Sequence, residues 1–64
     1  MDEKFLKLVE VMALVRRSKP SIYADMKKGT FPSPIKLGPR AVAWLESDVK
    51  GWMAAHIAES KGKQ

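Results

Sequence analysis

The sequence predicts a mainly α-helical fold with a small β-hairpin, and three features of the 64-residue chain lead to it. Two short helical patterns follow one another across a tight break. A stretch rich in proline and glycine then separates two extended runs, and a longer amphipathic helix comes last. A chain this short forms at most one domain. We therefore expect a single domain over residues 1–64, with an ordered core at about 5–58 and a polar tail at 59–64.

The first helix is expected from position 8, because apolar residues there recur at spacings of three and four. The run at 5–8 fits either a short strand or the lead-in to this helix. Ser18 is a candidate N-cap for a second helix, Pro20 suits its first turn, and Gly29 is a natural C-terminal stop. Two short helices joined by a turn of about three residues form a helix-turn-helix. The apolar face of the first helix comprises Leu8, Val11, Met12 and Val15.

A β-hairpin is expected after the second helix. The Phe-Pro-Ser-Pro segment at 31–34 cannot be helical, because proline fixes its own backbone and restricts the residue before it. Extended runs are expected at 35–37 and 41–44, and Gly38-Pro39 breaks the chain between them. A hairpin directly after a helix-turn-helix is a wing, so the predicted fold class is a winged helix-turn-helix.

The last helix is expected to begin at Ser47, a candidate N-cap, with Asp48 in its first turn. We interpret His56, the only histidine, as a core-edge residue, because one histidine without clustered ligands is a weak metal or catalytic signal. Trp44 and Trp52 lie in regular apolar patterns and are expected to anchor the core rather than stack on bases. The apolar stripe of this helix comprises Val49, Trp52, Met53, His56 and Ile57.

The net charge of +5 is unevenly distributed along the chain. Residues 16–40 hold seven basic residues and a single acid, Asp25, which gives 7 − 1 = +6. The rest of the chain holds five basic and six acidic residues, which gives 5 − 6 = −1. Such a concentration is typical of a polyanion-binding surface, although charge alone fits a solvated surface equally well.

Several classes of protein are disfavoured by the sequence. The chain has no cysteine for disulfides or thiolate metal sites, and it shows no paired carboxylates, phosphate-binding glycine loop or Ser/His/Asp set. We therefore expect no enzyme, no catalytic or metal site, no cofactor and no small-molecule substrate. No apolar run approaches the roughly 18 residues of a membrane span, and the N-terminus opens with acids. A cytoplasmic, nucleoid-associated bacterial protein without membrane contact is expected.

The second helix has the character of a recognition helix. Ile22 and Met26 define its buried face, and the opposite side is small, polar and basic, as insertion into the DNA major groove requires. Lys19 and Ser21 lie at its leading end and are the candidates for base-edge contacts. The other candidates are expected to contact phosphates or, from the hairpin, the adjacent minor groove. The predicted DNA-binding residues are Arg16, Arg17, Lys19, Ser21, Tyr23, Lys27, Lys28, Lys36 and Arg40.

Four segments together show a family resemblance: 8–15, Ser-Lys-Pro-Ser-Ile-Tyr at 18–23, the run from Lys to Trp at 28–44, and Glu-Ser-Asp-Val at 46–49 with Trp52. Over about residues 5–57 the chain resembles the AlpA family of phage and prophage regulators, which is similar to excisionase and MerR-type DNA-binding domains. The resemblance implies a winged-helix fold in which 18–21 opens the recognition helix, and a transcription regulator that acts on integrase or excision genes. Positions that depart from the usual family residues are Arg16, Arg17, Lys19 and Pro20.

Three functions remain open at this stage. The first is a sequence-specific regulator that binds double-stranded DNA, with self-association or cooperative binding on adjacent sites, because one small domain makes few contacts. The second is an excisionase-like factor that bends DNA. The third, from another class, is a protein-interaction module of the antitoxin or antirepressor type. An RNA-binding protein would instead prefer single strands and exposed aromatic residues.

Overall fold

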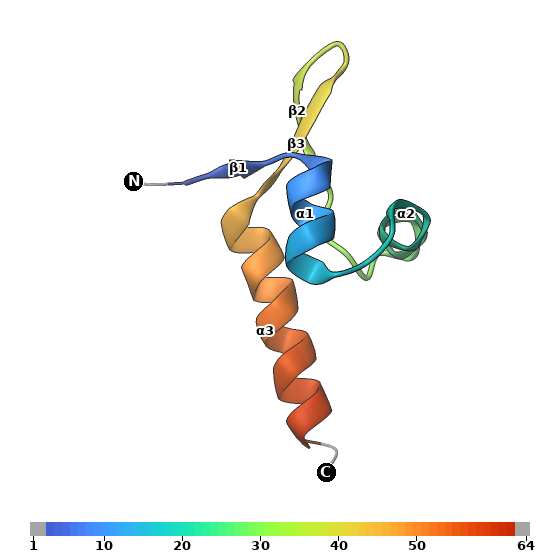
Figure 1. Cartoon of the computed structure of the whole chain (residues 1–64), viewed down its shortest axis with the longest axis vertical. Coiled ribbons are helices and arrows are strands. Elements are labelled where there is room, and N and C mark those ends of the chain that lie inside the picture. The colour runs from blue at the N-terminus through green and yellow to red at the C-terminus, as the bar shows by residue number, and fades with distance from the viewer. Residues whose placement is uncertain (1–2, 63–64) are drawn as a thin grey trace.

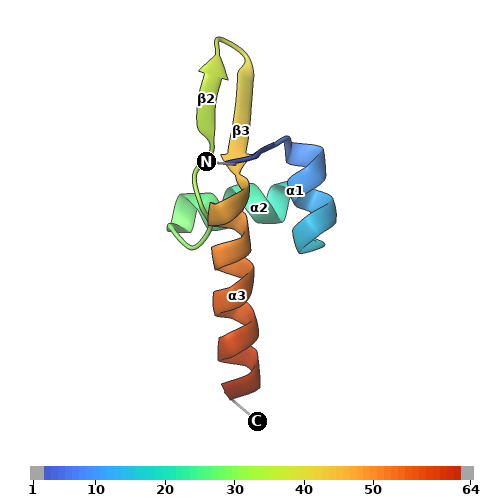
Figure 2. The same ribbon diagram turned by 90° about the vertical axis from the view of Figure 1, so that its left-hand side faces the viewer.

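The computed structural model describes residues 3–62, and Figure 1 shows the arrangement of its elements. The hairpin and the last helix extend in opposite directions from the level of the first two helices (Figures 1 and 2). This architecture is mainly α-helical with one hairpin and confirms the predicted winged helix-turn-helix fold class. In chain order the elements are β1 (Phe5–Leu6), α1 (Leu8–Val15), α2 (Lys19–Lys28), β2 (Ile35–Gly38), β3 (Ala41–Leu45) and α3 (Glu46–Gly62).

The first helix forms where its apolar spacing predicts it. Val11 is fully buried, and Leu8, Met12 and Val15 pack around it against the core. The backbone N–H of Lys7, just before the helix, donates to a Glu10 carboxylate oxygen at 2.7 Å, which satisfies a donor at the helix start. The helix ends when Arg16 takes a left-handed conformation with φ of 58°.

The second helix also has the predicted bounds, because local signals define both of its ends. It begins after Ser18 and stops at Gly29, whose φ of 80° favours glycine, and the Gly29 N–H donates to the Met26 carbonyl at 3.1 Å. The capping role predicted for the Ser18 side chain is wrong. Its hydroxyl donates to the Ser21 hydroxyl at 3.1 Å and makes no bond to the helix backbone.

A three-stranded antiparallel sheet with the order β1-β3-β2 supports the hairpin. The ambiguous run at 5–8 is a strand followed by a helix start, and Leu6 pairs with Trp44. The predicted hairpin is confirmed, with an irregularity between Lys36 and Gly38. Because side chains alternate along a strand, the pairing of β1 with β3 directs Leu6 and Trp44 into the core.

The core lies where β3, α1, α2 and α3 meet. Trp44 is fully buried, as predicted, and its indole N–H donates to the Pro32 carbonyl at 3.0 Å. This bond anchors the extended segment between α2 and β2, whose proline-containing backbone leaves carbonyl groups free to accept. The buried core residues are Leu6, Val11, Ile22, Phe31, Trp44 and Val49.

The last helix differs from its prediction at both ends. It begins at Glu46, directly after β3, and Ser47 is not its N-cap. The Ser47 hydroxyl instead lies 3.1 Å from both carboxylate oxygens of Glu3, to which it donates, because β1 brings Glu3 beside the helix start. At the other end, residues 59–62 continue the helix rather than forming the expected tail. Positions 63–64 of that tail lie outside the described residues.

Candidate nucleic-acid interface

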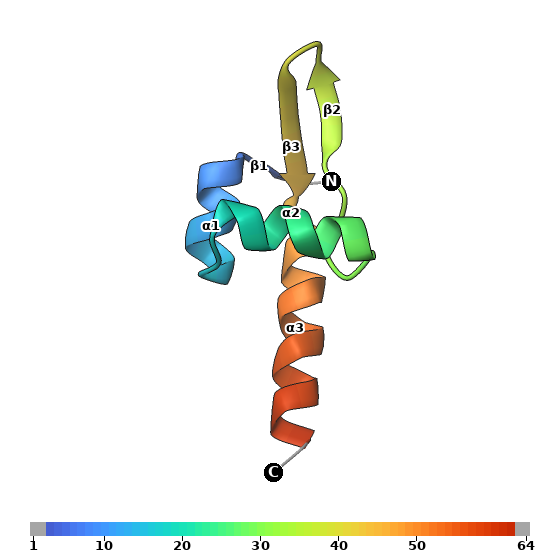
Figure 3. The same cartoon turned by 90° about the vertical axis from the view of Figure 1, so that its right-hand side faces the viewer.

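The outer face of α2 is exposed and basic. Figure 3 shows α2 crossing in front of α3, with the hairpin extending beyond it. Ile22 is fully buried beneath the helix, and Asp25 and Met26 are half-buried. The Lys19 ammonium lies 6.0 Å from the centroid of the Tyr23 ring, within range of a cation–π contact. The exposed residues of α2 are Lys19, Pro20, Tyr23, Ala24, Lys27 and Lys28.

Ser21 does not lie on this outer face, contrary to the orientation expected from the sequence. It is half-buried, and its hydroxyl accepts the bond from Ser18. The expected orientation was defined by Ile22 and Met26 alone. The buried side also includes Asp25, which rotates the outward direction toward Tyr23 and moves Ser21 to the edge of the helix.

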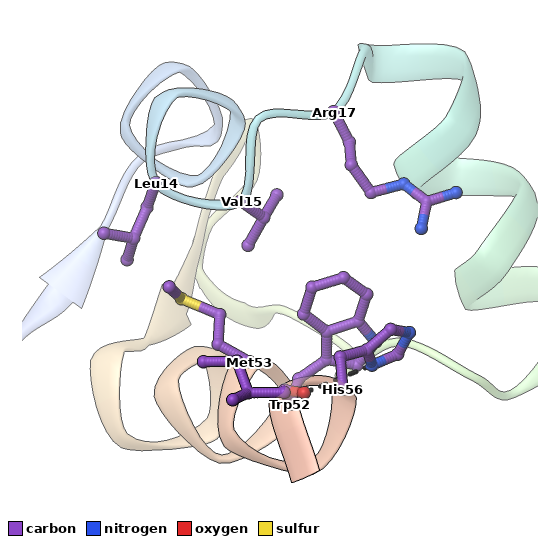
Figure 4. Close-up of a pocket in the computed structure, with 7 residues that line it drawn as sticks. Leu14, Val15, Arg17, Trp52, Met53 and His56 are labelled. Carbon is purple, nitrogen blue, oxygen red and sulfur yellow. Dashed lines mark hydrogen bonds between the residues drawn. The ribbon is translucent and has the colours of Figure 1, made fainter. Parts of the chain in front are cut away.

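Asp25 is half-buried because Arg17 is its partner. The Arg17 guanidinium lies 3.0 Å from the Asp25 carboxylate and 5.9 Å from the centroid of the Trp52 ring. Figure 4 shows Arg17 reaching from the turn toward this indole on α3. The guanidinium therefore connects α2 to α3, and a buried carboxylate needs such a partner.

This ion pair leaves the remaining positive charge of residues 16–40 unneutralised. Since Asp25 is the single acid of the stretch and is paired with Arg17, all other charges there are positive. Each remaining basic residue is exposed and, within residues 3–62, forms no ion pair. These six residues, which we call the basic set, are Arg16, Lys19, Lys27, Lys28, Lys36 and Arg40.

Trp52 fixes the segment that leaves α2. Its indole N–H donates to the Thr30 carbonyl at 2.8 Å, and its ring meets Phe31 edge-on at a centroid distance of 5.0 Å. The helical spacing correctly placed Trp52 against the core, where it is half-buried. Its contacts with Arg17 and Thr30 were not predicted, since no sequence pattern reports which carbonyl an indole will reach.

His56 is exposed rather than at the core edge, so that interpretation is wrong. Its ring lies 3.9 Å from the Trp52 ring by centroids, and its Nδ1 is 3.2 Å from the Trp52 carbonyl (Figure 4). The apolar stripe continues along α3 past the point where the body of the protein ends. Among residues 3–62, no group of three or more metal-ligating side chains is found, and no helix is long and apolar enough to cross a membrane.

The hairpin presents two of the basic set beside exposed apolar side chains. Lys36 in β2 pairs with Val42 in β3, and Arg40 lies in the turn between the strands. Leu37 and Val42 are 52% and 41% exposed. The far end of the hairpin is therefore both cationic and apolar.

A helix pair joined by a tight turn, an exposed basic second helix and a basic hairpin define a winged helix-turn-helix protein. The chain matches, over residues 4–57, the family described as prophage CP4-57 regulatory protein (AlpA), and it belongs to this family. It is also similar to a protein of Enterobacteria phage P4 described as uncharacterized protein ORF88. The two are 48% identical over 60 residues, which cover 94% of this chain and 68% of the phage protein. No solved structure matches the chain.

Proposed function

We propose that this phage regulatory protein is a transcriptional regulator that binds double-stranded DNA in a sequence-specific way. The observation on which the proposal rests is the basic set: six exposed cations on the turn, the outer face of α2 and the hairpin, without an acid among them. Membership of a prophage regulatory family supports the same conclusion. Following the family resemblance, we propose integrase or excision genes as its targets.

The outer face of α2 enters the major groove in this proposal. Pro20 and Ala24 have short side chains, so the outer face of α2 can approach the base edges closely. The major groove, about 12 Å wide, admits an α-helix. Lys19, at the leading end, is our candidate for a base-edge contact. Ser21 is our candidate for a contact at the rim of the groove, and the Tyr23 hydroxyl for a phosphate contact.

The rest of the basic set positions the protein on the duplex. Arg16, Lys27 and Lys28 bind phosphates on either side of the recognition helix. Lys36 and Arg40 bind the adjacent minor groove or its phosphates, where cations are favoured. Arg17 has a different role in this proposal: it holds α2 in place through Asp25 and Trp52.

Bending of DNA during excision is a second candidate function, and the exposed Leu37 beside Lys36 favours it. Proteins that kink DNA often insert an apolar side chain between base steps from the minor groove. Gel mobility of fragments with the binding site at the centre or at one end measures such a bend. A bend that Leu37→Ala removes supports this role, and equal mobility of the two fragments excludes it.

A gel-shift series against salt tests the main proposal, with a random-sequence duplex as the probe. Each neutralised phosphate contributes about −0.9 to the slope of log affinity against log salt, so about five contacts give a slope near −4 to −5. A flat response, or no shift, contradicts DNA binding and points to a protein-interaction module. Stronger competition by single-stranded RNA than by duplex DNA points to an RNA-binding protein.

Single substitutions locate the contacts within the same assay. Lys28→Ala and Lys36→Ala are each expected to make the slope less negative by about 0.9. Lys50→Ala is the matched control, because Lys50 lies on α3 and its ammonium pairs with Glu46 at 3.8 Å. An equal change in all three variants contradicts an interface on α2 and the hairpin. Selection from a random duplex library then measures specificity.

A further inference from the structure

A largely apolar groove of about 390 Å³ lies between the end of α1 and the middle of α3, beside the turn that holds Arg16 and Arg17. Figure 4 shows Leu14 and Val15 of α1 facing Met53 of α3 across it. The other residues that line the groove are Arg17, Trp52, His56 and Ile57. Leu14 is 37% exposed and Ile57 is 53% exposed. In a chain with so small a core, these two side chains are apolar surface that folding leaves uncovered.

The second half of α3 is exposed within the part of the chain that the structure describes. From Ala54 to Lys61 every residue is exposed, and α3 extends past the other helices in both Figure 1 and Figure 3. The helix has 17 residues and is about 25 Å long. A helical segment this short is marginal in water without packing, since isolated helices need roughly 12–15 residues. A partner on the groove side would stabilise it.

Charge identifies a second copy of this chain as the suitable partner. The chain carries +5 overall, but α1 contains one charged residue, Glu10, and α3 contains three acids and two lysines, which gives 2 − 3 = −1. Two copies that meet at α1 and α3 therefore bring together helices of low net charge. Of the two arginines at the end of α1, Arg17 is already neutralised by Asp25. The outer faces of both α2 helices stay accessible in such a dimer.

We propose that the groove binds the projecting half of α3 from a second copy, in a two-fold symmetric dimer. The dimer rests on the proposed function in that it gives a structure to the self-association expected of such a regulator. Dimerisation itself does not require DNA. A two-fold axis perpendicular to α3 makes the two α3 helices antiparallel, and each then contacts the other copy's groove. Because α1 and α3 run in about the same direction in Figures 1 and 3, the partner's α3 then lies antiparallel to α1.

The antiparallel arrangement also brings opposite charges together. If the partner's Ile57 covers Leu14, the partner's Lys61 lies one helical turn further along α3. Glu10 lies one turn before Leu14 on the same face of α1, and so it faces that lysine. Each dimer would contain this ion pair twice, at the two ends of the apolar contact.

Sedimentation equilibrium of the whole chain without DNA tests the proposal from micromolar to millimolar concentration. The wild type is expected to show a monomer–dimer equilibrium. Leu14→Glu and Ile57→Glu are each expected to weaken dimerisation about tenfold or more, because each places a charge in an apolar contact. Val9→Glu and Ala55→Glu are matched controls on exposed positions of the same helices, outside the groove, and should leave it unchanged. Circular dichroism checks that each variant is folded.

The charge pair provides an independent measurement. Lys61→Glu is expected to weaken dimerisation, and Glu10→Lys in the same chain is expected to restore it. A wild type that stays monomeric at every concentration overturns the proposal, as does equal weakening by the control variants. Gel shifts distinguish the two proposals: a dimer that does not shift duplex DNA refutes the proposed function alone, and a monomer that shifts it refutes the dimer alone.

Discussion

Arg17 illustrates how a basic residue beside an exposed basic helix can make its contacts within the protein. Its guanidinium bridges the Asp25 carboxylate, whose side chain is only 16% exposed, and the Trp52 ring. Both partners belong to the protein, so the contacts orient α2 relative to α3. Arg16, its neighbour in the chain, is exposed and belongs to the basic set. Adjacent arginines therefore have different roles in the proposed interface.

Arg17→Ala separates positioning from phosphate contact. We expect a loss of about 1 kcal/mol in the free energy of unfolding, because Asp25 loses a partly shielded partner. The slope of DNA affinity against salt should stay the same, since no phosphate contact is lost. Urea unfolding and the gel-shift salt series measure the two quantities.

The matched variant is Arg16→Asn, because asparagine tolerates the left-handed backbone at this position. It should leave stability within about 0.5 kcal/mol of wild type and make the salt slope less negative by about 0.9. If Arg17→Ala changes the slope as much as Arg16→Asn does, Arg17 is a phosphate contact after all.

At the scale of elements, the sequence predicted the boundaries that proline and glycine determine, although the side-chain cap expected at Ser18 is absent. The bounds of α2 follow from a proline in its first turn and a glycine at its end, and the hairpin follows from the break at Gly38-Pro39. The start of α3 was missed because the Ser47 hydroxyl donates to Glu3, which lies 44 positions earlier in the chain, instead of capping the helix. The orientation of Ser21 was missed because it depends on the ion pair of Asp25, a contact between elements.

Gly51, within α3, and Gly29, directly after the end of α2, should respond oppositely to alanine. Gly51 lies on the exposed side of α3, and a Cβ there meets no atom within 4 Å. Gly51→Ala is expected to stabilise the protein by about 0.5–1 kcal/mol, because alanine loses less backbone entropy in a helix. Gly29→Ala should cost about 1 kcal/mol, since alanine is strained at the φ of 80° that ends α2.

Urea unfolding of the two alanine variants against wild type gives the sign of each change. The Gly51→Ala variant also reports on whether the first half of α3 is helical at position 51. If both substitutions destabilise the protein, α3 does not continue as a regular helix through position 51.

At the scale of the molecule, the basic set and the apolar groove are two surfaces with different chemistry that meet at the turn after α1. The basic set occupies the turn, the outer side of α2 and the hairpin, and the apolar groove lies between α1 and α3. The charge imbalance of the sequence predicted the first face, because charges stay exposed wherever they fall. The groove was not predicted, since Leu14 and Ile57 fit the core stripes of their helices as well as any buried residue does. The groove stays exposed because α3 extends past the other helices, as Figure 1 shows.

A regulator with these two faces should bind paired DNA sites with a defined spacing. A two-fold dimer carries two α2 helices at a fixed separation, so two inverted copies of a selected site should bind more tightly than one. The gain should be largest where both sites present the major groove to the same side of the duplex, a condition that recurs about every 10.5 base pairs. Leu14→Glu should lose this gain and keep the affinity of wild type for a single site. Gel shifts on a spacing series measure both, and a gain that is independent of spacing or insensitive to Leu14→Glu would show that the copies do not meet through the groove.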